Sequence, residues 1–137
     1  MKGSKVILDT NIWVSFFIMA KLPQLESLVR DNELQVLTCH KLMHEIVTVI
    51  KRDKFKKYLK KSFETYINMH LDLSKFIRIE LRFEGSPDPD DNFLFDLALQ
   101  SGADYLVTGD KKLLAMENVE NVQAISLRKF EEMLSGT

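Results

Sequence analysis

The stretch that decides the fold is Val6-Ile7-Leu8-Asp9-Thr10-Asn11, in which three apolar residues lead directly into an acid, a hydroxyl and an amide. A short continuous apolar run that ends in polar residues predicts a strand buried on both faces, as in parallel sheets. Asp9 then stands at the carboxyl end of the strand, where open α/β sheets bind their ligands. Taken alone, however, this acid is more simply explained as a turn residue or a helix cap.

A second segment near the other end of the chain repeats the arrangement. Leu106-Val107-Thr108-Gly109-Asp110 is again a buried strand followed by a hydroxyl and an acid. The carboxyl ends of parallel strands on either side of a topological switch point lie side by side. Two strands that end in this way within one small domain favour a shared site over two unrelated caps.

The rest of the chain alternates strand and helix patterns. The spacing of apolar residues predicts strands over about residues 5–9, 34–38, 76–83, 105–107 and 122–125, and helices over about 12–20, 23–30, 40–52, 53–73, 91–100, 111–116 and 128–134. This alternation implies an α/β protein with a mostly parallel sheet and helices on both faces. We expect one domain over residues 5–134 between flexible ends at 1–4 and 135–137.

Composition narrows the class of protein. The 137 residues carry a formal net charge of −1, so no overall field points to a nucleic-acid partner. Cys39 is the only cysteine, which excludes an internal disulfide and fits a reducing compartment. No signal-peptide pattern and no membrane-length apolar run is present, so we expect a cytoplasmic protein.

Two further acids border predicted buried surfaces. Glu45 lies about 60° from Leu42 on an ideal helical wheel, beside the apolar stripe of a helix that begins near the same sheet rim as Asp9. A boundary glutamate in a salt bridge is an equal alternative. Asp91 shares a helix face with Phe95, whereas its neighbour Asp90 is the better candidate for a solvent-facing cap.

Four carboxylates gathered at one place repel one another and resist burial, and a cation resolves that conflict. Ligands that are all oxygen suit Mg²⁺ or Mn²⁺ rather than zinc, and His40 and His44 have no Cys/His partners for a zinc site. We therefore expect Asp9, Glu45, Asp91 and Asp110 to bind divalent metal for phosphodiester cleavage. Neutral side chains beside them could orient the acids, namely Thr10, Asn11 and Thr108.

Four segments together resemble the motifs of the PIN-domain family. They are Val6-Ile7-Leu8-Asp9-Thr10-Asn11, Glu45, Asp88-Pro89-Asp90-Asp91-Asn92 and Thr108-Gly109-Asp110. The likeness runs from about Lys5 to Leu134. Within the family, the chain resembles more specifically the PIN-type toxins of prokaryotic toxin–antitoxin pairs. The four acids in this order and at these separations form a fairly specific signature, although each one alone is weak.

The resemblance implies a three-layer α/β/α sandwich around a mostly parallel sheet of about five strands. It implies a Mg²⁺- or Mn²⁺-dependent endoribonuclease in which Asp9, Glu45, Asp91 and Asp110 are the metal-binding and catalytic acids. It also implies a cognate antitoxin protein and, since such toxins commonly dimerise, a homodimer. Apolar residues over 12–17 and 127–134 are the surface we expect a homodimer to use.

One departure from the family pattern concerns the number of metals. Many relatives carry a further acid two or three residues after the fourth, where this chain has Lys112 and Leu113. Either Lys112 contacts a phosphate or a second metal binds weakly, and the sequence leaves one and two metals both open. It also assigns no role to Asp90, Asp96 or His44, and it favours a surface or boundary place for His44 and His70.

A basic segment is the other candidate feature. Seven Lys and Arg residues lie between Lys51 and Lys61, on the outer side of the predicted 53–73 helix, and Tyr58 among them could stack on a base. Such a run is equally well a solvated face. If it overhangs the acidic site, its charges would hold RNA phosphates there. The candidate RNA-binding residues are Lys54, Lys57, Lys61 and Lys112.

Two other functions remain open. A Mg²⁺-dependent phosphohydrolase of the phosphatase or receiver kind needs a second acid near the first, and Asn11 counts against the phosphatase version. A non-catalytic interaction module that keeps the fold but has lost useful metal affinity is the second, and Lys112 makes it conceivable.

Overall fold

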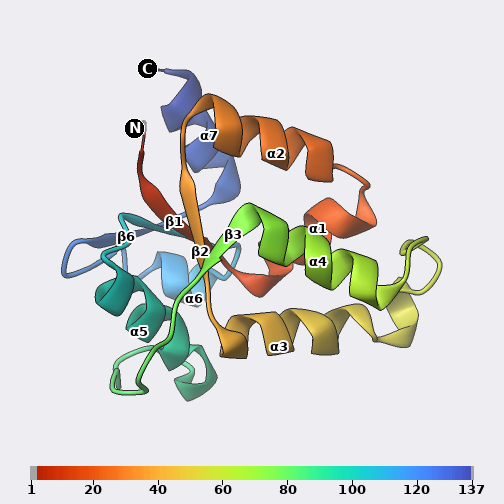
Figure 1. Ribbon diagram of the computed structural model, residues 1–137. Helices are drawn as coiled ribbons and strands as arrows, with labels where there is room; N and C mark the ends of the chain where they lie inside the picture. The colour runs from red at the N-terminus through yellow and green to blue at the C-terminus, as the bar shows by residue number, and fades with distance from the viewer. Residues whose placement is uncertain (1–2, 137) are drawn as a thin grey trace.

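The computed structural model describes residues 3–136, and its centre is a six-stranded sheet (Figure 1). The strands are β1 (Lys5–Leu8), β2 (Gln35–Thr38), β3 (Ser74–Phe76), β4 (Tyr105–Val107), β5 (Asn118–Val119) and β6 (Val122–Ile125). They follow the order β3-β2-β1-β4-β6-β5 across the sheet, and only the short β5 runs antiparallel to its neighbour. The predicted mostly parallel α/β sheet is confirmed.

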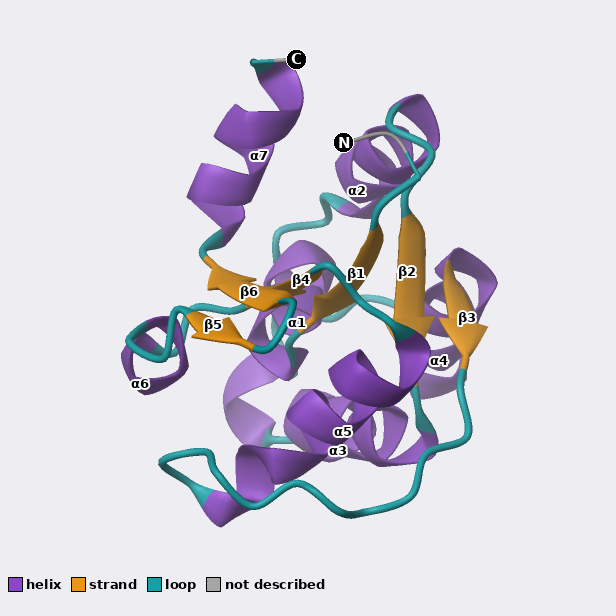
Figure 2. Cartoon of the chain, turned by 90° about the vertical axis from the view of Figure 1, so that its left-hand side faces the viewer, coloured by secondary structure: helices purple, strands orange, loops and turns teal. Residues whose placement is uncertain are grey.

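Helices cover both faces of this sheet. They are α1 (Thr10–Ile18), α2 (Leu22–Asp31), α3 (His40–Ile50), α4 (Phe63–Leu73), α5 (Asn92–Ser101), α6 (Lys111–Leu114) and α7 (Leu127–Ser135), with two 3-10 turns, η1 (Asp53–Phe55) and η2 (Pro89–Asp91). Figure 1 shows α1, α2 and α4 on one side of the strands β1 to β3 and α5 on the other. Figure 2 shows the strands side by side from β6 to β3.

The strand order creates the switch point that the sequence predicts. From β1 the chain winds outward to β2 and β3, and from β4 it winds in the opposite direction to β6, so that β1 and β4 are the central pair. Leu8 pairs with Val107 at the carboxyl ends of these two strands. Because Ile7 and Leu106 are fully buried, the register of this pair is fixed by the core. Asp9 and Thr108 therefore follow adjacent strand ends.

Two predicted elements are wrong. The predicted 53–73 helix is instead the short η1, an irregular basic stretch and then α4, which begins only after the cap residue Ser62. The predicted 76–83 strand is instead β3, which ends at Phe76, followed by a stretch outside the sheet. The partner strand β2 ends at Thr38, so it offers no further backbone groups after the bond from the Ile77 N–H to the Thr38 carbonyl. The two-residue β5 was not predicted, since it is too short to show a period.

Three residues, Phe130, Leu134 and His70, are more deeply buried than the sequence predicts. The apolar residues assigned to a homodimer surface lie partly in the core, with Phe130 only 1% and Leu134 only 5% exposed. His70 is also buried, against the expected boundary place; its Nε2 lies 2.8 Å from the Thr38 Oγ1, and burial lowers its pKa to about 4. His44 is exposed, as expected.

Of the chain ends predicted to be flexible, the structure describes residues 3–4 and 135–136. Residues 1, 2 and 137 of the predicted flexible ends lie outside the described residues. At Gly3 the backbone N–H donates to the Asn32 carbonyl at 3.2 Å, and α7 continues as far as Ser135. Between residues 3 and 136 no helix combines the length and the apolar character that crossing a bilayer requires.

Candidate functional site

Asp9 lies at the centre of the site, directly after β1, where it caps the first turn of α1. One carboxylate oxygen, Oδ1, accepts the Thr10 backbone N–H at 2.7 Å, and the other, Oδ2, accepts the Thr108 hydroxyl at 2.7 Å. The residue is 7% exposed, and burial raises its pKa despite these two hydrogen bonds. The predicted helix-cap role of Asp9 is therefore present, and its second oxygen is turned toward the residue that follows β4.

Thr108 connects this acid to Asp110. Its hydroxyl is fully buried, donates to Asp9 and accepts the Asp110 backbone N–H at 3.1 Å. Asp110 is exposed and caps α6 by accepting the Lys112 N–H at 2.8 Å. The charge of Asp110 contributes to the raised pKa of Asp9. The expected pairing of the two strand ends is therefore present, with Thr108 as the link.

Glu45 reaches the same rim from α3. Its Oε1 accepts the hydroxyl of Thr10, which is itself 3% exposed and is the first residue of α1. Burial raises the pKa of Glu45, and the nearby charge of Asp9 raises it further. Glu45 takes part in none of the ion pairs found among residues 3–136, so the salt-bridge alternative gains no support there.

Asp91 arrives from the opposite face of the sheet, at the last position before α5. Its pKa is raised to about 6, first by burial and then by the charges of Asp9, Asp88, Asp110 and Glu45. A carboxylate responds in this way only to charges that are close, since exposed charges are screened within about a Debye length. Hydrogen bonds through Thr108 and Thr10 thus link Asp9, Asp110 and Glu45, and Asp91 lies near enough for its pKa to respond to the charges of all three.

The donor set fits a hard divalent cation. It consists of carboxylate oxygens, and three of the four acids have raised pKa values because their charges are buried near one another. As they stand, no three His, Cys, Asp or Glu side chains within residues 3–136 converge as a ready metal cage. To bind one ion together, Asp9, Asp91 and Asp110 would therefore have to move closer to one another.

The other predicted site residues are less uniform. Thr10 and Thr108 are buried and hold the acids, whereas Asn11 and Lys112 are exposed. Asp90 is exposed too, and its backbone N–H donates to the Asp88 carboxylate at 3.0 Å. The basic residues Lys54, Lys57 and Lys61 are exposed in the segment that joins α3 to α4 (Figure 1). That segment follows the end of α3 that points away from β2, so it does not overhang the acids as a helix.

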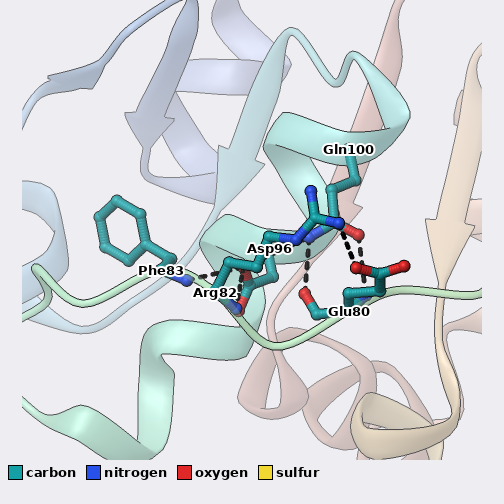
Figure 3. Close-up of polar contacts among 5 residues, drawn as sticks. All are labelled: Glu80, Arg82, Phe83, Asp96 and Gln100. Carbon is teal, nitrogen blue, oxygen red and sulfur yellow. Dashed lines mark hydrogen bonds and ion pairs between the residues drawn. The ribbon is translucent and has the colours of Figure 1, made fainter.

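The sequence interpretation missed how the segment before Asp91 is held. Figure 3 shows the extended stretch around residues 80–83 lying along α5, fastened by side chains of that helix. Asp96, 3% exposed, accepts the backbone N–H groups of Arg82 at 3.0 Å and Phe83 at 2.8 Å. Gln100 both accepts the Glu80 N–H at 2.8 Å and donates to the Glu80 carbonyl at 2.6 Å.

A third residue on the same face of α5 extends this attachment toward the site. The Asn92 Oδ1 accepts the backbone N–H groups of Gly85 at 3.3 Å and Ser86 at 3.0 Å. Positions 92, 96 and 100 are four residues apart and so share one helix face. We call residues 80–86 the strap. Asp96, which the sequence left without a role, supports the site from a distance by anchoring the strap that leads to Asp91.

Comparison with known proteins agrees with this architecture. The family model described as "PIN domain" matches residues 5–112. The structure of PAE2754 from Pyrobaculum aerophilum is similar, with a TM-score of 0.60 and 15% identity over 98% of this chain and 91% of that one. VapBC2 from Rickettsia felis, solved bound to a DNA fragment from their promoter, gives a TM-score of 0.57 and 16% identity over 89% and 98%. Among curated proteins none matches. The domain match covers most of the chain, including all four acids, and the chain belongs to the PIN domain family.

Proposed function

We propose that this protein is a metal-dependent endoribonuclease, and that it acts as the toxin of a toxin–antitoxin pair in the cytoplasm. The observation that carries the proposal is the grouping of Asp9, Glu45, Asp91 and Asp110 around the switch point between β1 and β4, where burial and the neighbouring charges raise the pKa values of Asp9, Glu45 and Asp91. Such a concentration of negative charge is unfavourable for folding alone, and it suits a site that works with bound cations.

In this proposal Asp9, Asp91 and Asp110 hold Mg²⁺ or Mn²⁺, and Glu45 either adds a ligand or orients and deprotonates the attacking water. The bound ion would supply a lowered pKa for water and neutralise charge on the phosphate. Thr108 keeps the Asp9 carboxylate pointed at the site through its 2.7 Å hydrogen bond, and Thr10 does the same for Glu45. Attack of the water on phosphorus would break the bond to the 3′-oxygen, and the proton lost by the water would pass to that oxygen, which leaves as a hydroxyl.

RNA as the substrate and an antitoxin as the partner follow from the likeness to PIN-type toxins, and the similarity in fold to VapBC2 supports the same class. Lys54, Lys57, Lys61 and Lys112 are exposed cations available for RNA phosphates. A homodimer stays part of the proposal, with half-buried Phe16 and Met133 rather than the core residues Phe130 and Leu134 available to a partner.

The test is cleavage of single-stranded RNA in Mg²⁺ or Mn²⁺ by the wild type and by Asp9→Asn. We expect a loss of more than about a hundredfold, because even the outer-shell partners of a metal site are worth about 10- to 100-fold. Glu131→Gln, which removes a charge from an exposed position in α7, is the matched control and should cleave like the wild type. Equal rates for wild type and Asp9→Asn would reject the assignment.

Two further measurements separate the alternatives. A non-catalytic interaction module would show no saturable heat when titrated with Mn²⁺, an outcome that the lack of a ready three-ligand cage within residues 3–136 makes worth checking. A phosphatase-type or receiver-type phosphohydrolase would be trapped by a phosphate mimic such as beryllofluoride, which a nuclease without a covalent intermediate does not bind in that way.

A further inference from the structure

Lys41 bridges the two helices that deliver Glu45 and Asp91 to the site. It is the second residue of α3, and its Nζ lies 5.4 Å from the centre of the Phe93 ring, on the second residue of α5. Glu45 lies four residues beyond it on the same face of α3. Asp91 lies two residues before Phe93. Lys41 therefore connects the helix that carries Glu45 to the helix that follows Asp91.

The charge of Lys41 is felt inside the site. Among the influences on Glu45, burial and the Asp9 charge raise the pKa, while the Thr10 hydrogen bond and the Lys41 ammonium lower it. Lys41 acts in the same direction on Cys39, which immediately precedes α3. The ammonium group is therefore within electrostatic reach of the acidic site.

The Lys41 ammonium nevertheless forms no ion pair with a carboxylate among residues 3–136. The ion pairs found among residues 3–136 join Lys56 to Asp53, Arg82 to Glu80, and Arg128 to Glu132, and none of them includes Lys41. The residue is exposed, and its Nζ lies over the Phe93 ring. A cation that lies near Glu45 and pairs with no carboxylate among residues 3–136 is available to an incoming anion.

An RNA strand needs such a cation at this place. Its phosphates carry negative charge and are repelled by the acids, and a lysine ammonium binds phosphate as a point charge. The basic segment between Lys51 and Lys61 begins about 15 Å further along α3, at a helical rise of about 1.5 Å per residue, so it cannot serve the same phosphate. We infer that Lys41 is a substrate-binding residue that contacts an RNA phosphate at the edge of the acidic site. This inference rests on the proposed nuclease function.

A purely structural role is the competing explanation, in which Lys41 only packs on Phe93. Lys41→Met separates the two, because it keeps the apolar stem over the ring and removes the charge. Lys41→Arg restores a cation. Lys129→Met is the control, since Lys129 is an exposed lysine in the first turn of α7, a helix that lies at the opposite end of the molecule in Figure 1.

The experiment measures KM and kcat for single-stranded RNA cleavage by the full chain with Mn²⁺ at several salt concentrations. For Lys41→Met we expect KM to rise about tenfold, more than kcat falls, because one phosphate contact is lost. The slope of log KM against log salt should drop by about 0.7, the value for one contact to a single strand. Lys41→Arg should be close to wild type, and Lys41→Met should still give saturable heat with Mn²⁺.

The inference is overturned if Lys41→Met matches Lys129→Met in both KM and salt slope, or if Lys41→Arg is as impaired as Lys41→Met. Those results leave the nuclease assignment intact, since the wild type still cleaves. If the wild type itself fails to cleave RNA with any divalent metal, the proposed function fails, and the role of Lys41 as an RNA contact fails with it.

Discussion

At the scale of single residues, hydroxyl groups decide where the carboxylates of this site point. Thr108 donates to Asp9 and accepts from the backbone of Asp110, while Thr10 donates to Glu45 and gives its backbone N–H to Asp9. The Asp9 and Glu45 carboxylates are therefore each oriented by the hydroxyl of a threonine from a different part of the chain. Both threonines are 3% exposed or less, and they orient the carboxylates without adding charge to a site that is already strongly negative.

Asp91 offers a residue-scale test of that excess charge. Its folded-state pKa is about 6, above the ordinary value of 3.8, so the ionised form destabilises the folded protein above pH 6 and this penalty disappears as the pH falls below 4. In the presence of a chelator we expect Asp91→Asn to raise the free energy of unfolding at pH 7.5 by about 1 kcal/mol, allowing for solvent screening of a half-buried group. Thermal melts at pH 7.5 and 4.5 measure the gain, which should be clearly smaller at the lower pH, where part of the penalty has already been lost.

When Mn²⁺ is added, Asp91→Asn should become less stable than the wild type, the reverse of their order in the presence of a chelator. A metal that binds only the folded state stabilises it, and Asp91→Asn removes one of the proposed ligands. Glu131→Gln, a charge change at an exposed position away from the site, should shift neither comparison. A chelator-treated Asp91→Asn that is less stable than the wild type at pH 7.5 would show that the four acids do not strain the fold.

The sequence was a good guide to three of these acids for physical reasons. Asp9 and Asp110 follow apolar runs that can only be buried strands, and strand ends in a parallel sheet have one shared edge. Glu45 sits beside a stripe of apolar residues that fixes the rotation of α3. Asp96 was not interpretable, because its partners are backbone N–H groups of residues 82 and 83, and no side-chain pattern reveals which backbone groups lack a strand partner.

At the scale of elements, the strap is held by a helix instead of a sheet. The sequence that leads into it, Ile77–Leu81, alternates with the period of a strand, yet β2 ends before this stretch can pair. The side chains of Asn92, Asp96 and Gln100 supply the missing acceptors from α5. The strap therefore connects the last strand of one half of the sheet to the acid that completes the site.

Asp96→Ala tests this attachment. It leaves two backbone N–H groups without their acceptor, which should lower the free energy of unfolding by about 2–3 kcal/mol. Hydrogen exchange should speed up at the Arg82 and Phe83 amides while Ile7 in β1 stays protected at least to the level of global unfolding. Chemical denaturation and hydrogen exchange are the two measurements.

Asp96→Asn is the matched control, because its amide oxygen can still accept both N–H groups, and its loss should be clearly smaller. If Asp96→Ala and Asp96→Asn are equally stable, or if exchange rises uniformly instead of at the strap, then the hydrogen bonds to Asp96 do not hold this segment in place.

The basic segment shows where element prediction from sequence reaches its limit. Phe55 and Leu59 have helical spacing with Phe63, but lysines stand at four-residue separations between them, as at Lys56–Lys60 and Lys57–Lys61. Like charges four apart oppose a helix. Ser62 instead starts α4 by accepting the Thr65 N–H at 3.2 Å. The apolar spacing alone therefore predicts a longer helix than the cap at Ser62 and the repelling lysines allow.

At the scale of the whole molecule, charges of opposite sign are separated along α3. Glu45 lies midway along this helix, linked to Asp9 through Thr10, and the basic segment of residues 51–61 follows the end of the helix. One ion pair, Lys56 to Asp53 at 3.0 Å, lies within this segment, and three of its lysines lie over aromatic rings, namely Lys51, Lys54 and Lys57. The net charge of −1 hides this separation, so composition alone could not have indicated a nucleic-acid surface.

The separation of charge along α3 offers a path for a bound RNA strand. If RNA runs along α3 from the acids to the basic segment, the triple variant Lys54→Gln, Lys57→Gln, Lys61→Gln should raise KM about tenfold or more and lower the salt slope by about 2, at about 0.7 per contact. Its thermal stability should stay near wild type, since all three side chains are exposed. The control triple, Lys21→Gln, Lys75→Gln, Lys129→Gln, changes the net charge equally at exposed positions elsewhere. Identical KM values for the two triples would mean that the segment is only a solvated surface and that the strand leaves the site by another route.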